Sequence, residues 1–242
     1  MRPLAVLFFL FLSFSIFAQE QVHYATVLEQ QVVTTSEKEA NKQIFGTLLN
    51  HYAEQNKLLP SEEELSQFKA FGKLSKEIHR KKDELKLAEL MKIEATRSLS
   101  SEELKQKKIL VEMQQQWQKE VEAKDDIHMD KFMNDMANGF VKNWKINKSL
   151  YETYGGGIVF QQAGLESADA RLAFFEIEKK KGNLEFHSEE FESQFWAMLT
   201  PNHNHFSYQE KPEGNPFDVP FWIDAIEKME EELETLVSKQ EQ

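Results

Sequence analysis

The sequence predicts a mainly α-helical fold, multi-helical with one long antiparallel helical hairpin and a minor two- to three-stranded β element. Two observations support this prediction. The 242 residues include only 9 glycines and 6 prolines, whereas the helix-favouring residues glutamate, lysine, glutamine and leucine are abundant. In addition, no glycine or proline occurs between Lys73 and Asn138. That stretch is long enough for two helices separated by a short break.

The N-terminus predicts export. Arg2 precedes an apolar run from Leu4 to Phe17, and the small residue Ala18 is followed by polar Gln19. A basic start, an apolar run too short to span a bilayer and a small residue at its end are typical of a cleaved signal peptide, expected here over residues 1–18. We expect the periplasm as the final compartment, with secretion as the alternative, and no stable membrane insertion after cleavage.

Composition excludes several kinds of site. The chain has no cysteine, which excludes disulfides, thiolate metal sites and cysteine nucleophiles. The formal net charge of −12 argues against nucleic acid as a partner, because nucleic-acid binding needs a basic surface. The chain that follows the signal peptide is expected to divide into a helical body over residues 19–199, a loop over 200–219 and a C-terminal amphipathic helix over 220–242.

Two short β-prone runs, Tyr24–Leu28 and Val32–Thr34, begin the mature chain. They are expected to form either a small hairpin or one extended arm that lies on a helix. A helix is then predicted to start near Thr34–Ser36 and to end at about Asn56. Thr34 with Glu37, or Ser36 with Glu39, has the spacing of a capping box, and the apolar residues that follow recur at helical spacing.

The long helical hairpin is defined by two further capping pairs. Ser61 with Glu64 predicts the start of its first arm, directly after a proline. Ser100 with Glu103 predicts the start of the second arm, so the break is expected over residues 98–101. Both arms carry apolar residues at helical spacing, which in the second arm are Leu110, Met113, Trp117 and Val121. Two such arms joined by a short break are expected to pack antiparallel.

The best-defined folding unit follows the hairpin. An amphipathic helix ends at Tyr154, and the run Gly155-Gly156-Gly157 predicts a sharp exit that other residues tolerate poorly. Ile158–Phe160 is expected to be a strand, and a further helix is predicted from Ser167. The short extended piece Leu184–Phe186 is expected to pair with Ile158–Phe160.

The last part of the body and the C-terminus complete the pattern. Another helix is predicted from Ser188 to about Leu199, and the loop follows it. Apolar residues then recur at spacings of four, three, four and three over Trp222, Ile226, Met229, Leu233 and Leu236. This narrow stripe is typical of a helix that packs against one other helix. It either docks on the body, which the pattern favours, or pairs with a partner, including a second copy of the chain.

Little in the sequence points to catalysis. His203 and His205 form the only close histidine pair, but the nearby acidic residues lack ligand spacing, so a polar loop is favoured over a metal site. The glycine run at 155–157 ends a helix, whereas phosphate loops begin one, and no GxSxG nucleophile motif is present. We therefore predict no catalytic, cofactor-binding or metal-binding residues, and no cofactor.

One apolar cluster is the candidate peptide-binding surface. Its members lie on the helix that ends at Tyr154, and they are Met129, Phe132, Met133, Met136, Phe140 and Trp144. Flexible methionines suit surfaces that accept varied apolar peptides. The same residues also suit an ordinary core, and the spacing alone favours the core. The functional hypothesis is that part of this cluster lines a groove for extended apolar segments.

A series of short motifs carries a family resemblance. They are Ala25-Thr26-Val27, Val32-Val33-Thr34 with Glu37, Ile44, Leu48-Leu49, Tyr52-Ala53, and Asn56-Lys57-Leu58 leading into Pro60-Ser61-Glu62-Glu63-Glu64-Leu65. Over about residues 22–95 the chain resembles the N-terminal chaperone region of SurA-type periplasmic proteins and their parvulin-like relatives. The stretch from Trp144 to Asp169 resembles a block found in exported bacterial proteins of uncharacterised activity.

The resemblance implies a protein that holds unfolded outer-membrane proteins in the periplasm. The family's parvulin isomerase domain has no counterpart in this sequence, so only the helical, peptide-holding part is implied. The expected function is a non-catalytic chaperone or interaction protein for extended hydrophobic segments of unfolded polypeptide. Two alternatives stay open: a degenerate peptidyl-prolyl isomerase or other periplasmic enzyme, and a scaffold that assembles as a homo-oligomer through Trp222–Leu236.

Overall fold

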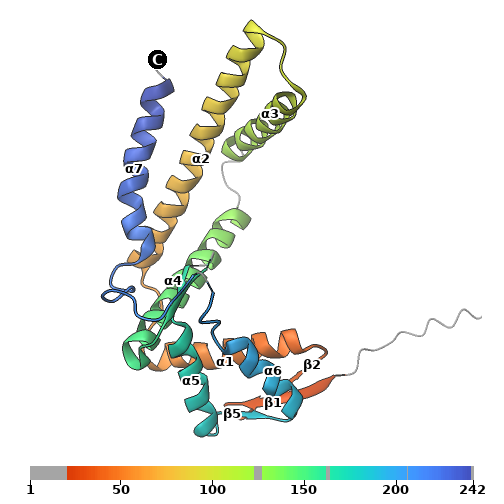
Figure 1. Ribbon diagram of the computed structural model, residues 1–242, viewed down its shortest axis with the longest axis vertical. Helices are drawn as coiled ribbons and strands as arrows, with labels where there is room; N and C mark the ends of the chain where they lie inside the picture. Colours follow the sequence, from red (N-terminus) through yellow and green to blue (C-terminus); the bar gives the residue numbers. More distant parts are fainter. Residues whose placement is uncertain (1–20, 123–126, 162–163, 206, 241–242) are drawn as a thin grey trace, which may run out of the picture.

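The computed structural model describes residues 21–122, 127–161, 164–205 and 207–240, so the expected signal peptide lies outside the described residues. The described chain is mainly α-helical with minor β structure, which confirms the predicted fold class. It forms an arch in which a body of strands and short helices continues into an arm of long helices (Figure 1). The elements in chain order are β1 (Val22–Val27), β2 (Gln30–Thr34), α1 (Glu37–Gln55), α2 (Glu62–Thr96), α3 (Ser101–Glu122), α4 (Ile127–Tyr154), β3 (Ile158–Gln161), β4 (Gly164–Glu166), α5 (Ala168–Lys180), β5 (Leu184–Phe186), α6 (Glu189–Leu199), β6 (Tyr208–Gln209) and α7 (Phe221–Gln240).

The strands form two small antiparallel sheets. In the first, β2, β1 and β5 lie side by side, and in the second the order is β4, β3 and β6. β1 and β2 form a hairpin whose turn residues Leu28 and Glu29 have positive φ angles of 49° and 66°. Such angles at both turn positions match the right-handed twist of paired strands. The hairpin, one of the two expected arrangements, is therefore the one that forms.

The predicted partner of Leu184–Phe186 was wrong. These residues form β5, which pairs with β1 rather than with Ile158–Phe160. The turn after α5 explains why β5 pairs with β1. The Leu28 backbone N–H donates to the Asn183 carbonyl, and this hydrogen bond places the residues that follow alongside β1. Leu184 then becomes almost fully buried against the apolar face of β1, whereas β3 obtains β4 and β6 as neighbours.

The body has one phenylalanine-rich core. Helices α1, α5 and α6 and the C-terminal end of α4 contribute to it together with the first sheet. Its largest fully buried side chains are those of Phe175, Phe191, Phe195, Ile44, Leu48, Leu150 and Leu184. Burial of each such side chain contributes about 1.5–3 kcal/mol to folding, so this cluster supplies much of the driving force for the body.

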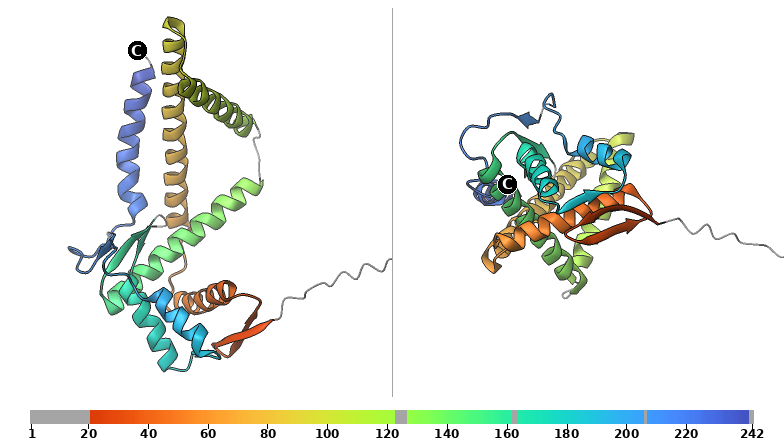
Figure 2. Two further views of the ribbon diagram at one scale, coloured as in Figure 1. Left: turned by 45° about the vertical axis from the view of Figure 1, so that its right-hand side comes forward. Right: turned by 90° about the horizontal axis from the view of Figure 1, so that it is seen from below.

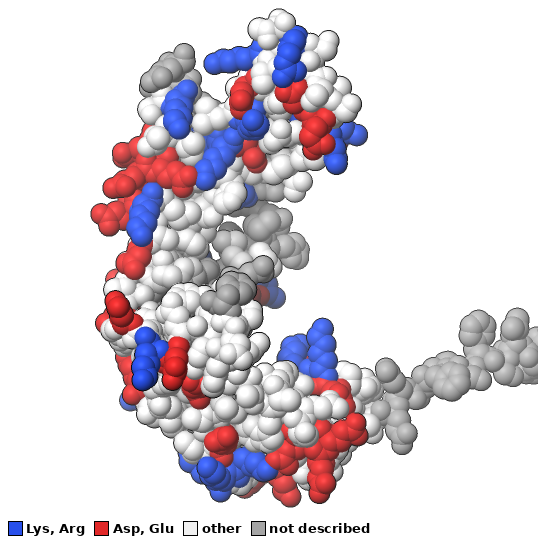
Figure 3. Space-filling view, in the orientation of Figure 1, with Lys and Arg blue, Asp and Glu red and all other residues white. Residues whose placement is uncertain are grey.

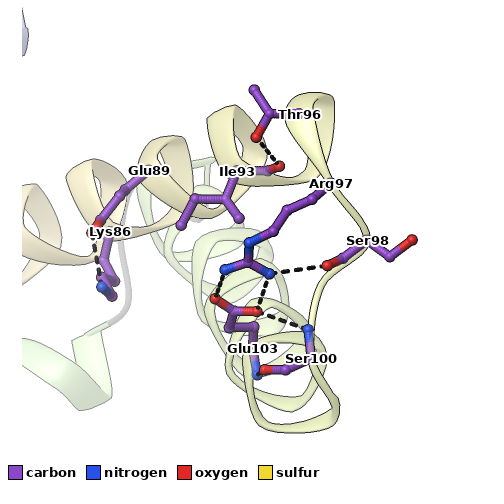
Figure 4. Close-up of polar contacts among 8 residues, drawn as sticks. All are labelled: Lys86, Glu89, Ile93, Thr96, Arg97, Ser98, Ser100 and Glu103. Carbon is purple, nitrogen blue, oxygen red and sulfur yellow. Dashed lines mark hydrogen bonds and ion pairs between the residues drawn. The ribbon is translucent and has the colours of Figure 1, made fainter.

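The arm begins with α2, a helix of 35 residues that starts with the predicted capping box at Ser61 and Glu64. The chain turns at Arg97 and continues as α3, so the predicted break is confirmed. Figure 4 shows the turn: the Arg97 guanidinium donates to both carboxylate oxygens of Glu103, at 2.7 and 3.0 Å. Glu103 also accepts the Ser100 backbone N–H at 2.7 Å. The hydrogen bonds from Arg97, followed by those from Ser100, lower the pKa of Glu103 to about 2.

The last helix, α7, lies along α2 rather than away from the molecule (Figure 2). Its apolar stripe faces α2: Trp222 is fully buried, Leu236 is nearly so, and Ile226, Met229 and Leu233 are half-buried. An ion pair of 2.7 Å between Lys82 and Glu232 joins the two helices. Within one chain the stripe is therefore covered by α2, as the docking interpretation expected.

The junction between body and arm is aromatic. Phe140 of α4 stacks on Phe68 of α2 with ring centroids 5.3 Å apart, and Trp222 of α7 meets Phe68 edge-on at 5.4 Å. A polar contact closes the same region, since the Lys145 ammonium donates to Glu64 at 2.9 Å and to the Leu59 carbonyl at 3.0 Å. Three helices distant in sequence thus meet at one point.

Among the described helices none is long and apolar enough to cross a bilayer.

Candidate functional site

The residues of the predicted peptide-binding surface differ in how far their side chains are buried. Met136, Phe140 and Trp144 are half-buried and pack around Phe68 and Trp222 in the junction. Met133 is also half-buried and faces Gly72 of α2, where a Cβ would lie 3.3 Å from the methionine methyl group. Phe132, in contrast, is 60% exposed. The side chain of Met129 lies outside the described part of the chain.

An open groove lies instead between α2 and α3, on the arm. It encloses about 460 Å³ and is lined by Arg80, Asp83, Glu84, Leu87, Leu110, Met113, Gln114, Trp117 and Gln118. Near the tip of the arm the two helices touch through Leu87, Leu90 and Leu110. Beyond that contact α3 diverges from α2 (Figure 2), so Met113 and Trp117 are only half-buried. The groove is therefore the space that opens where the helical hairpin separates.

The groove has an apolar floor and a polar rim. Leu87 and Leu110 are buried at its closed end, and the thioether of Met113 and the indole of Trp117 extend the apolar surface along α3. On the α2 side, the guanidinium of Arg80 pairs with Glu77 and lies 3.8 Å from a carboxylate oxygen of Glu84. Asp83 adds a second lining carboxylate against the single guanidinium of Arg80, so this rim is mildly acidic and disfavours an anionic ligand.

Sequence reasoning identified the groove residues but assigned them to packing. Leu110, Met113 and Trp117 form the predicted apolar stripe of the second hairpin arm, which was expected to face the first arm. In the structure α7 covers much of α2, and α3 approaches α2 only near the tip. The half-buried state of Trp117 is the consequence. Trp117, the aromatic residue of α3, was the available signal, but a tryptophan suits a buried core and a binding groove alike, so it does not distinguish the two.

A second polar cluster surrounds Asp169, next to the glycine run. The Gly157 backbone N–H and the Tyr208 hydroxyl donate to its Oδ2 at 2.6 and 2.8 Å, and His203 Nε2 lies 3.2 Å from its Oδ1. Burial, followed by the hydrogen bond to Asp169, raises the pKa of Tyr208 to about 12, so the phenol keeps its proton at neutral pH. A Cβ at Gly157 would lie 2.2 Å from the Tyr208 hydroxyl.

This cluster is a structural connection between α5, β6 and the end of α4. The two histidines that the sequence analysis singled out have different partners here. His203 contacts Asp169, whereas His205 Nδ1 lies 2.6 Å from the Ser207 hydroxyl. Across the described residues, no group of three or more histidine, aspartate or glutamate side chains has an arrangement that fits a metal ion. The glycine run ends α4 as predicted, with Gly155 and Gly156 at positive φ angles of 66° and 90°.

Comparison with known proteins returned no relatives: the chain matches no protein-family model, no curated protein and no solved structure.

Proposed function

We propose that this protein is an exported, non-catalytic chaperone or interaction protein that holds extended apolar segments of unfolded polypeptide in the groove between α2 and α3. The observation that supports the proposal is the groove itself, with an apolar floor that continues along α3 through Met113 and Trp117. Outer-membrane proteins in the unfolded state are the clients that the SurA-type resemblance suggests.

The size and composition of the groove suit such a client. A volume of about 460 Å³ lies within the range of protein ligand sites and accommodates a few apolar side chains at a time. Methionine is flexible and polarizable, so it adapts to side chains of different shape, and tryptophan offers a large apolar face. A site of this kind selects for apolar character rather than for one sequence.

The rim suits the backbone of the same client. Gln114 and Gln118 place amide side chains beside the apolar floor, and amides both donate to and accept from peptide groups. The carboxylates of Asp83 and Glu84 outnumber the guanidinium of Arg80 at this rim, so the rim disfavours negatively charged groups and suits neutral peptide groups. Further acidic side chains gather along α7, on the outer side of the arch (Figure 3), where they favour solubility of a carrier that binds apolar segments.

The test measures suppression of aggregation of a denatured outer-membrane β-barrel protein by the chain from Gln19 to Gln242. Met113→Lys places a charge in the apolar floor, and Trp117→Ala removes its largest side chain. We expect each change to weaken binding of a fluorescent apolar peptide by about tenfold or more, which corresponds to about 1.4 kcal/mol. Suppression of aggregation should fall in parallel.

Met91→Lys is the matched control, because Met91 lies on α2, is 56% exposed and does not line the groove. It should retain the binding and suppression of the parent chain. If Met113→Lys binds the peptide as tightly as Met91→Lys, the groove is not the binding site. A parent chain that never suppresses aggregation would contradict the holding function, and turnover of a proline-containing peptide would favour the isomerase alternative.

A further inference from the structure

A separate cleft lies in the body, between β3, the end of α6 and the segment that follows it. It encloses about 720 Å³. Its apolar walls come from Phe45, Val159, Phe160, Met198, Leu199 and Pro201. Phe160 and Met198 are each 51% exposed, although both are large apolar side chains. None of the residues that line this cleft belongs to the groove between α2 and α3.

The polar end of the cleft is rigidly built. Arg171 donates to Glu166 at 3.3 Å through Nη1 and to the Oδ1 of Asn147 at 3.0 Å through Nη2. Asn147 is fully buried, and the same oxygen accepts the backbone N–H and the hydroxyl of Ser167. The Gln161 amide donates to Glu166 at 3.3 Å. These contacts fix the guanidinium and the carboxylate before any ligand arrives.

The charges at this end compensate each other. The Arg171–Glu166 pair is largely shielded from solvent, with side-chain exposures of 16% and 21%. A ligand carboxylate or phosphate would gain attraction from the guanidinium and suffer repulsion from the neighbouring glutamate. The other polar lining groups are the amides of Gln161 and Asn202, the hydroxyls of Thr200 and Ser207, and the imidazole of His205, whose Nδ1 lies 2.6 Å from the Ser207 hydroxyl. None of these groups is a carboxylate, a guanidinium or an ammonium. The cleft therefore favours a neutral ligand that combines an apolar group with amides.

We propose that this cleft is a second anchor site, which binds a bulky apolar residue within an extended polypeptide through that residue's side chain and its flanking peptide groups. The inference rests on the proposed function in naming the same class of client. It adds a place in the body at which that client is held and a preference for internal, uncharged segments over chain ends.

The test uses two peptides and NMR spectroscopy. Acetyl-Ala-Phe-Ala-amide carries only neutral groups, whereas acetyl-Ala-Phe ends in a free carboxylate. The neutral peptide should shift the backbone amide resonances of β3 and of the end of α6 in a saturable way, and the free acid should bind at least fivefold more weakly. Phe160→Ser and Met198→Ser should each weaken binding of the neutral peptide by fivefold or more. Thermal unfolding followed by circular dichroism checks that both variants fold.

Met91→Ser and Met113→Lys are the controls, because neither residue lines the cleft. Both should leave binding of the neutral peptide at β3 unchanged. Equal or tighter binding of the free acid, no saturable shifts at β3, or unchanged binding by both folded cleft variants would each overturn the proposal. The two proposals can be contradicted separately. Peptide binding at β3 without suppression of aggregation would contradict only the holding function, and suppression of aggregation without binding at β3 would contradict only the anchor site in the cleft.

Discussion

The body and the arm are held together in different ways. In the body, strands and four helices share one phenylalanine-rich core, in which Phe45, Phe175, Phe186 and Phe195 form a continuous set of ring contacts. Where α2 meets α3 in the arm, the buried apolar residues are Leu87, Leu90 and Leu110, with partly buried Val111 packed against them. Ion pairs such as Arg97–Glu103 and Lys107–Glu94 also join the two helices.

The difference has a direct energetic meaning. Apolar burial is cooperative across a shared core, whereas exposed ion pairs contribute at most about 1 kcal/mol each. The body is therefore the region that determines global stability, and the α2–α3 pair is the region in which local opening costs least. A binding groove located in the second region can adjust its width without unfolding the first.

The largest expected effect is in the body core. Phe195 is fully buried and contacts several other aromatic rings, so Phe195→Ala should lower the free energy of unfolding by about 3–5 kcal/mol. Urea unfolding followed by far-ultraviolet circular dichroism measures the change. Phe132→Ala, at a 60% exposed phenylalanine on α4, is the control and should change the same quantity by less than about 0.5 kcal/mol. Similar losses for the two variants would contradict the comparison.

A smaller and local effect is expected in the arm. Leu110→Ala removes a buried side chain that holds α3 against α2, and the free energy of local opening of α3 should fall by about 2 kcal/mol. Amide hydrogen exchange should then accelerate by roughly thirtyfold in α3, with little change in the body. Leu104→Ala, at a 52% exposed leucine of the same helix, should leave exchange unchanged. Faster exchange throughout the body would show that the arm and the body unfold as one unit.

The smallest effect concerns the turn between α2 and α3. Arg97→Gln should raise the pKa of Glu103 from about 2 toward the ordinary glutamate value, because the first cause of its depression is lost. A depressed pKa means that the contact is fully present above the ordinary glutamate pKa and is lost as the pH falls through about 2. An NMR titration of the Glu103 carboxyl carbon measures the shift. Lys86→Gln, which removes a separate pair with Glu89 (Figure 4), should not move it.

Local signals in the sequence predicted the helix starts and the helix stop. Ser36, Ser61 and Ser100 each accept the backbone N–H three residues later, as the capping pattern implies. The glycine run ends α4 because its positive φ angles are accessible to glycine. These features depend on residues within one helical turn of each other, which is why a sequence read in short windows is sufficient to find them.

Long-range pairing was not accessible in the same way. A strand of three residues such as Leu184–Phe186 has no feature that specifies its partner, and its pairing with β1 follows from the turn at Asn183. The open groove was missed for a related reason. The stripe through Met113 and Trp117 has the same spacing whether α2 covers it or not. What leaves it open depends on where α7 packs on α2, and that position is set by contacts between residues far apart in the sequence, such as Phe68 and Trp222.

The docking of α7 also has a consequence for how the molecule is assembled. Phe68 belongs to the first third of the chain, whereas its partner Trp222 lies close to the C-terminus. A chain that leaves a ribosome or a translocation pore N-terminus first therefore presents α2 with one apolar side uncovered until α7 emerges. Contacts between such distant segments slow folding, because a large loop must close before they form. The arch is thus completed only after α7 has emerged, and a nascent chain that stops before Trp222 lacks the side chain that joins body to arm.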